Sequence, residues 1–150
     1  MLIFLLYGNY TFSQQQKIIK NENVVYGMVS GAALLMDIYQ PENSNHKGII
    51  VIPGSAYGFV YNDVYDQEQL KNDYFLDTFY LGKWAQILTN KGYTIFVINH
   101  RFSPAFKYTD IIADCRRAVR FVRFNAEKYS INPQKLGAFG HSSGASLAAL

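Results

Sequence analysis

Three short, nearly continuous apolar runs constrain the fold of this chain more than any other feature. They span residues 48–52, 93–98 and 136–139. Runs of this length without polar alternation are typical of strands that are covered on both faces. A helix-like segment follows each run, at residues 79–89, 109–128 and 143–150. This alternation predicts an α/β fold, with a mostly parallel sheet and helices on both faces.

A hairpin is expected before these runs. Residues 24–29 and 34–39 have the composition of strands, and Ser30-Gly31 separates them. Thr109-Asp110 is expected to cap the helix over 109–128. That helix has one apolar face, at positions 111, 115, 118, 119 and 122. Apolar residues make up 49% of the 150-residue chain, which is typical of one globular domain and not of a disordered segment.

Composition excludes several classes of function. The formal net charge of +3 is too small to indicate nucleic-acid binding. Four arginines are spaced as on the solvated face of a helix, at positions 116, 117, 120 and 123. No segment approaches the about 20 apolar residues of a membrane span. Cys115 is the only cysteine and is expected to be a buried structural thiol. No metal-ligand cluster or nucleotide-binding glycine loop is present, so no metal and no cofactor are predicted.

The first residues resemble an export signal. An apolar run at residues 2–7 precedes small and polar residues, which is typical of the end of a secretory signal peptide. We therefore expect residues 1–16 to be a leader and residues 17–150 to be the folded domain. A secreted or periplasmic protein is expected, and a cytoplasmic one is the alternative.

The pattern Gly-x-Ser-x-Gly occurs at Gly140-His141-Ser142-Ser143-Gly144. It lies between an expected strand and an expected helix, which is the setting that this motif needs for catalysis. Small flanking residues let the strand and helix pack closely, and the Ser142 hydroxyl then projects above the sheet. The Ser143 N–H is placed to donate to a developing oxyanion. Ser142, in the central position of the motif, is therefore the predicted nucleophile. The alternatives are Ser143 as the nucleophile, or a small-residue turn without chemistry.

Several segments in a fixed order support a family resemblance. They are residues 36–41, the loop 52–57, Asn99-His100-Arg101-Phe102-Ser103-Pro104, residues 114–126, residues 129–133 and the 140–144 turn. Residues 33–150 resemble the esterase/lipase branch of the α/β-hydrolases. They are most similar to small carbohydrate-acetyl and feruloyl esterase-like members, near the hormone-sensitive-lipase type.

The resemblance implies a second part of an oxyanion hole after residue 52. The family usually has His-Gly-Gly-Gly and an aromatic residue there, and this chain has Pro53-Gly54-Ser55-Ala56-Tyr57. The resemblance assigns the backbone donors to Ser55 and Ala56. Gly54, Tyr57 and His100 are expected to line the pocket. An alanine in place of a glycine that needs positive φ would be strained.

A catalytic serine also needs a base and an acid, which follow the serine in these hydrolases. The three histidines are His46, His100 and His141, and none lies after Ser142. We therefore expect an N-terminal part of an α/β-hydrolase, incomplete at the C-terminus, with the acid and the base beyond residue 150. This part alone would lack an efficient triad and would leave a sheet edge unpaired. Asp37 and Asp114 are expected to be structural, with Asp114 paired to Arg101.

The predicted function is hydrolysis of small acyl esters by a serine carboxylic-ester hydrolase. Acetylated or feruloylated carbohydrates are the favoured substrates. The alternatives are a peptidase or amidase of the same fold, and a non-catalytic binding protein, which the altered 53–56 loop favours. The aromatic and acidic segment 57–75 is expected to form a sugar-binding rim, a lid or a surface insertion. No motif indicates an oligomeric state.

Overall fold

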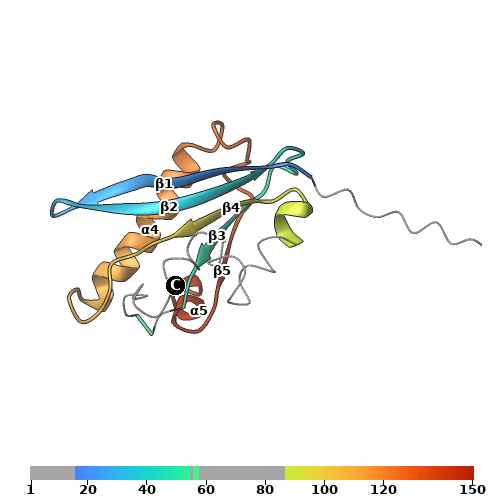
Figure 1. Ribbon diagram of the computed structural model, residues 1–150. Coiled ribbons are helices and arrows are strands. Elements are labelled where there is room, and N and C mark those ends of the chain that lie inside the picture. The colour runs from blue at the N-terminus through green and yellow to red at the C-terminus, as the bar shows by residue number, and fades with distance from the viewer. Residues whose placement is uncertain (1–15, 55, 58–86) are drawn as a thin grey trace, which may run out of the picture.

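The computed structural model of the chain describes residues 16–54, 56–57 and 87–150. The described elements, shown in Figure 1, are β1 (Ile18–Val29), β2 (Ala32–Pro41), β3 (Gly48–Ile52), β4 (Thr94–Ile98), α4 (Tyr108–Phe124), β5 (Leu136–Gly140) and α5 (Ser143–Ala148). Residues 87–90 are also helical. All of the expected leader except Gln16, and nearly all of the 57–75 segment, lie outside the described residues.

The described strands form one sheet in the order β1-β2-β4-β3-β5. β3 is parallel to both β4 and β5, whereas β2 is antiparallel to both β1 and β4. Four of the five described strands therefore run in the same direction. Consecutive parallel strands are connected through helical segments, which confirms the predicted α/β architecture.

The hairpin between β1 and β2 confirms the sequence prediction. Ser30 and Gly31 form its two-residue turn, with φ of 49° and 81°. Two successive positive φ values are typical of the type I′ turn, whose twist matches that of the strands. Further along β1, the Asn23 N–H donates to Asp37 Oδ1 at 2.8 Å. Asp37 is therefore structural, as predicted, because it satisfies an amide where the register of β1 and β2 shifts.

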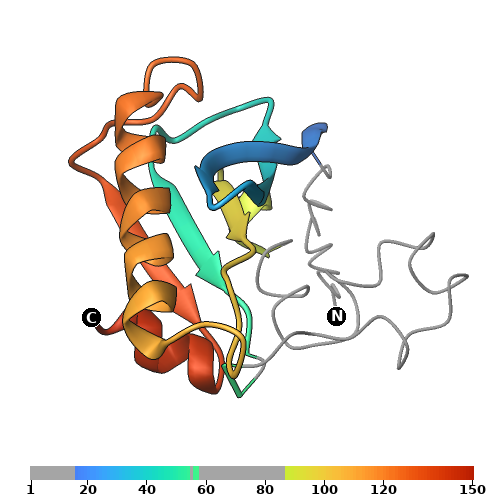
Figure 2. The ribbon, with the colours of Figure 1, turned by 90° about the vertical axis from the view of Figure 1, so that its left-hand side faces the viewer.

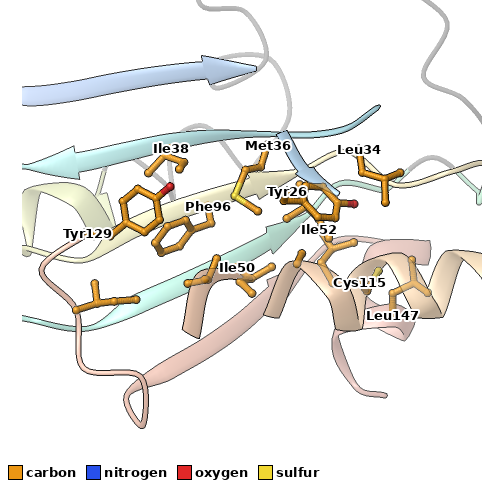
Figure 3. Packing of buried hydrophobic residues seen from close by; sticks show 14 of the residues in the cluster. Tyr26, Leu34, Met36, Ile38, Ile50, Ile52, Phe96, Cys115, Tyr129 and Leu147 are labelled. Carbon is orange, nitrogen blue, oxygen red and sulfur yellow. The ribbon is translucent and has the colours of Figure 1, made fainter. Parts of the chain in front are cut away.

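The two faces of the sheet contact different helical segments. On one face, side chains of β2, β3 and β4 pack against α4 and α5, which lie on the same side of the sheet in Figure 2. Figure 3 shows residues of this core, including Met36, Ile50, Phe96, Cys115 and Leu147. The opposite face buries Tyr39, Val51, Ile95 and Val97, and Leu88 from the helical residues 87–90 packs against them. Helices therefore cover both faces, as the apolar runs predict.

Both ends of α4 differ from the prediction. The helix begins at Tyr108, and Lys107 is its N-cap, so the prediction that Thr109-Asp110 caps the helix is wrong. Asp110 contributes from the third helical position, where its Oδ2 accepts from the Lys107 N–H at 3.1 Å. The helix ends at Phe124, before the predicted residue 128. The Asn125 side chain donates to the Phe121 carbonyl oxygen at 2.8 Å, and turns follow.

β5 is more exposed than its apolar sequence predicts. It pairs with β3 and is the outer strand of the described sheet. Gly137 and Ala138 are exposed, so the prediction of a buried strand is wrong for the described residues. β5 is exposed because it is the outermost described strand and has a neighbouring strand on only one side. This edge corresponds to the unpaired edge expected from the sequence.

Candidate active site

The turn between β5 and α5 holds Ser142 in an unusual backbone conformation. Its φ is 51° and its ψ is −124°, a region that residues other than glycine rarely adopt. The Gly144 N–H donates to the His141 carbonyl oxygen at 2.8 Å, and the Ala145 N–H donates to the Ser142 carbonyl oxygen at 3.0 Å. Ser142 is exposed, whereas Ser143 and Gly144 are buried. The sharp turn therefore presents the central serine of the motif to solvent.

The two glycines of the motif are required by close backbone contacts. A Cβ atom on Gly140 would lie 2.2 Å from the Gly144 carbonyl oxygen. A Cβ atom on Gly144 would lie 2.1 Å from the Ile52 carbonyl oxygen. Both distances are far below van der Waals contact. The strand–turn–helix packing predicted from Gly-x-Ser-x-Gly is thus present, and it extends to the end of β3.

The loop after β3 lies directly against this turn. A Cβ atom on Gly54 would lie 2.9 Å from Ser142 Cβ and 2.5 Å from the His141 carbonyl oxygen. Ala56 and Tyr57 follow with φ of 52° and 61°, so both are in the left-handed region. Ala56 thus adopts the positive φ that the family's glycine would accept more readily. Ser55 lies outside the described residues.

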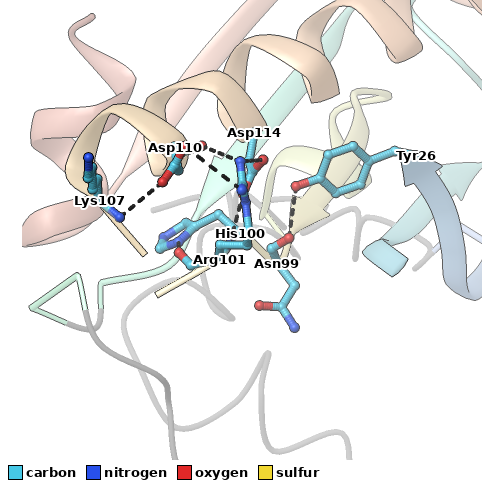
Figure 4. A network of polar contacts seen from close by, with 7 residues as sticks. All are labelled: Tyr26, Asn99, His100, Arg101, Lys107, Asp110 and Asp114. Atoms are coloured by element: carbon cyan, nitrogen blue, oxygen red, sulfur yellow. Dashed lines mark hydrogen bonds and ion pairs between the residues drawn. The ribbon is translucent and has the colours of Figure 1, made fainter. Parts of the chain in front are cut away.

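The loop after β4 is anchored to α4 by an ion pair (Figure 4). Arg101 Nε donates to Asp114 Oδ2 at 2.8 Å, and Arg101 Nη2 donates to Asp114 Oδ1 at 2.9 Å. The Arg101 backbone N–H also donates to Asp114 Oδ2, at 3.0 Å. The hydrogen bond to Asp114 raises the pKa of the Arg101 guanidinium. Asp114 is fully buried, so the predicted structural pair is confirmed.

The described histidines have different surroundings. His46 precedes β3, at the amino end of the parallel strands, and its Nδ1 lies 2.9 Å from the Ser130 carbonyl oxygen. Since Ser142 lies at the carboxyl end of these strands, His46 is too far away to act as its base. His100 follows β4, is half-buried, and places Nδ1 2.6 Å from the Arg101 carbonyl oxygen (Figure 4). His141 lies within the turn itself and is exposed.

Two contacts on Tyr57 were missed by the sequence reasoning. The Ser103 N–H donates to the Tyr57 carbonyl oxygen at 2.7 Å. The Tyr57 and Tyr108 rings meet edge-on, with centroids 5.1 Å apart. The only signal in the sequence is that Ser103 belongs to the 99–104 segment, which the family resemblance places at the site.

Cys115, at the middle of α4, is buried as predicted. Burial, with a smaller contribution from the negative charge of Asp114, raises the pKa of its thiol to about 12. The four predicted surface arginines of α4 are all exposed. Among the described residues, no three acidic, histidine or cysteine side chains gather where they would hold a metal ion. No described helix is both long and apolar enough to span a bilayer.

The strand order, the parallel β4-β3-β5 core and the strained serine turn together define an α/β-hydrolase fold. Within that fold, the chain belongs to the BD-FAE family, an esterase family whose model matches residues 36–150.

Curated relatives and solved structures agree with this placement. An acetylxylan esterase of Xylanibacter ruminicola is 27% identical over 77% of this chain and 21% of its own length. A kynurenine formamidase of Meyerozyma guilliermondii is 31% identical over 74% of this chain and 35% of its own length. The structure of a truncated carbohydrate esterase from gut microbiota superposes with a TM-score of 0.69, at 29% identity over 91% of this chain and 44% of that one. The chain thus spans less than half the length of each.

Proposed function

We propose that the protein containing this chain is a serine carboxylic-ester hydrolase in which Ser142 is the nucleophile. The observation that carries the proposal is the backbone of Ser142, with φ of 51° and ψ of −124° between β5 and α5. A non-glycine residue in a strained conformation at the carboxyl end of a parallel sheet is typical of catalytic nucleophiles. Membership of an esterase family supports the same reaction class.

In the proposed reaction, Ser142 Oγ attacks the acyl carbonyl carbon and its proton passes to a base. The carbonyl oxygen becomes an oxyanion, which the backbone N–H groups of Ser143 and Ala56 stabilise. Ser55, outside the described residues, is the other proposed donor. The C–O bond then breaks, the alcohol leaves with the proton, and water hydrolyses the acyl-enzyme. The base and its acid are proposed to follow residue 150, in line with the family's chain order.

Small acyl esters of carbohydrates are the proposed substrates. The supporting observations are the 27% identity to an acetylxylan esterase and the superposition on a carbohydrate esterase. We also propose that residues 1–16 are an export leader, because an apolar run at residues 2–7 precedes small and polar residues. Gly54, Tyr57 and His100 are proposed to line the pocket beside Ser142, because they lie in the loops that follow β3 and β4.

Amide hydrolysis is the second candidate. The 31% identity to a kynurenine formamidase favours it, since that relative is named for cleaving an amide. The same serine turn serves both reactions, because an acyl-enzyme forms in each. The two substrates differ in the leaving group, which is an alcohol for an ester and a less acidic amine for an amide.

The test uses the polypeptide from the complete reading frame that contains these 150 residues. Hydrolysis of p-nitrophenyl acetate and of p-nitroacetanilide is measured for the parent protein, Ser142→Ala and Ser146→Ala. Ser146 is an exposed serine of the same helix and provides a matched control. We expect faster ester than anilide cleavage and a loss in Ser142→Ala of at least about 10⁴-fold in kcat.

Each other outcome rejects a specific part of the proposal. Faster cleavage of the anilide would favour the amidase. Equal rates in the parent protein and in Ser142→Ala would reject Ser142 as nucleophile. A folded parent protein that cleaves neither substrate would favour a binding protein whose altered 53–56 loop no longer supports catalysis.

A further inference from the structure

Tyr57 is held at both its backbone and its ring. The Ser103 N–H donates to its carbonyl oxygen at 2.7 Å. Its ring meets the Tyr108 ring at 5.1 Å between centroids and 82° between planes, which is the favourable edge-to-face arrangement. Ser103 lies in the loop after β4, and Tyr108 is the first residue of α4. Segments far apart in the sequence therefore fix one residue of the loop after β3.

Both contacts come from a part of the molecule that is itself firmly anchored. Arg101 joins the loop after β4 to the buried carboxylate of Asp114 through three hydrogen bonds. The Phe106 N–H donates to the Phe102 carbonyl oxygen at 2.9 Å, which closes the loop. Asp110 then caps the first turn of α4 through the Lys107 N–H. The segment that contains Ser103 is thus bonded to α4 before it, through Arg101, and after it, through Lys107.

The residues next to this contact need external support. Ala56 and Tyr57 both have positive φ, at 52° and 61°, and neither is glycine. Conformations of this kind persist only where the surrounding structure holds them. The direction of the Ala56 N–H depends on these same backbone angles. Loss of the hold on Tyr57 would let the loop relax and turn that N–H away.

We propose that Tyr108 is a positioning residue, which acts through Tyr57 to keep the Ala56 N–H aimed at the oxyanion. The inference rests on the proposed function, because it assigns Tyr108 to the same reaction. Ser103 is the backbone partner in this role. Tyr108 itself lies outside the reacting atoms, and 43% of its surface is exposed, so its replacement leaves the buried core intact.

The kinetic test compares Tyr108→Ala, Tyr108→Phe and Phe124→Ala in the complete protein. Phe124 is an aromatic residue at the other end of α4, 90% exposed, and serves as the matched control. Removal of an oxyanion donor costs 10²–10³ in kcat, so misaiming one in Tyr108→Ala should cost about tenfold, with KM changed less than about twofold. Tyr108→Phe keeps the ring but removes the hydroxyl group, which also interacts with Tyr57, so its kcat should fall between those of Tyr108→Ala and the parent protein. Phe124→Ala should match the parent protein.

Two kinetic results would overturn the proposal. An unchanged kcat in Tyr108→Ala would show that the loop holds its geometry without the ring. A loss confined to KM would make Tyr108 a substrate contact and not a positioning residue.

A second measurement tests the link between Tyr108 and the loop separately from the proposed function. Hydrogen exchange of the Ser103 amide, which donates to Tyr57, is followed by NMR in the same variants. We expect faster exchange in Tyr108→Ala and parent-like exchange in Phe124→Ala. Equal exchange in all variants would overturn the link between Tyr108 and the loop. Faster exchange in a protein without esterase activity would keep the link and reject the proposed function.

Discussion

The turn after β5 and the turn after β3 both hold non-glycine residues at positive φ, and different contacts hold each of them. In the turn after β5, the strained residue is Ser142, and its restraints are hydrogen bonds within the turn and a close contact with the end of β3. The amides of Gly144 and Ala145 donate to carbonyl groups within the turn. The backbone of Gly144 is pressed against Ile52, so the chain has little room to move.

The turn after β3 depends on more distant restraints. Ala56 and Tyr57 are strained, and the contacts on Tyr57 come from Ser103 and Tyr108. The loop that contains Ser103 is in turn held to α4 by the ion pair between Arg101 and Asp114. The two turns belong to one candidate site, but each is stabilised by different contacts. The turn after β5 is held by its own hydrogen bonds and by β3, whereas the loop after β3 takes its geometry from α4.

The largest expected effect comes from breaking the anchor of the second turn. Asp114→Ala leaves the Arg101 guanidinium, with 13% of its side chain exposed, with only the more distant carboxylate of Asp110, at 3.9 Å. Loss of one partner of a buried pair should lower the free energy of unfolding by about 3–5 kcal/mol, measured by urea denaturation. The exposed pair of Lys20 and Glu22 provides the control, because Glu22→Ala should cost less than about 1 kcal/mol.

The same variant also tests the comparison directly. Asp114→Ala should speed amide exchange at Ser103, beside the turn after β3, and leave the Gly144 amide in the turn after β5 as protected as in the parent protein. Equal acceleration at both amides would show that the two turns share one support.

The second prediction concerns Gly144, in the turn after β5. A Cβ atom in Gly144→Ala would lie 2.1 Å from the Ile52 carbonyl oxygen, so the backbones of α5 and β3 must separate. Overpacking of this kind should cost about 1–3 kcal/mol of unfolding free energy in urea or thermal denaturation. Gly137→Ala is the control, because a Cβ atom there meets no atom within 4 Å. Similar stabilities for the two variants would contradict the close contact between this turn and the end of β3.

The third prediction uses the titration of Cys115, which lies beside Asp114 on α4. Burial raises the pKa of this thiol to about 12. Above about pH 9 the unfolded chain loses the thiol proton while the folded chain keeps it, so the folded state binds more protons. The free energy of unfolding should therefore fall with rising pH, by about 1.4 kcal/mol per unit from this group. Denaturation at several pH values should show a shallower slope in Cys115→Ala. Parallel slopes would show that the thiol titrates alike in the folded and the unfolded chain.

The features that sequence predicted well are those fixed by neighbouring residues. Ser30-Gly31 predicted the hairpin, because two successive positive φ values favour glycine beside a small polar residue. The glycines at 140 and 144 predicted the sharp turn for an equally local reason. The apolar runs predicted β3 and β4, because a strand covered on both faces has few polar positions.

The features that sequence missed depend on distant partners. An apolar run predicts a strand but not its neighbours, so the position of β4 between β2 and β3 was not predicted. The exposure of Gly137 and Ala138 has the same origin, since burial is set by what lies beside β5. The Tyr57–Tyr108 contact joins two tyrosines that no spacing rule connects. The family was easier to predict than the geometry, because the serine motif is a local pattern, whereas the shape of the loop after β3 depends on distant partners.

The smallest expected effect concerns the backbone strain at Ala56, in the turn after β3. Ala56→Gly removes the Cβ atom that opposes a φ of 52°, and should raise the free energy of unfolding by about 0.5–1 kcal/mol despite the greater freedom of glycine in the unfolded chain. The gain should persist in Tyr108→Ala, where the loop has lost its ring contact and glycine still accepts positive φ. Urea denaturation of the two single variants and the double variant measures this. If Ala56→Gly lowers the stability, then Ala56 is not strained, and the loop holds its shape without help from α4.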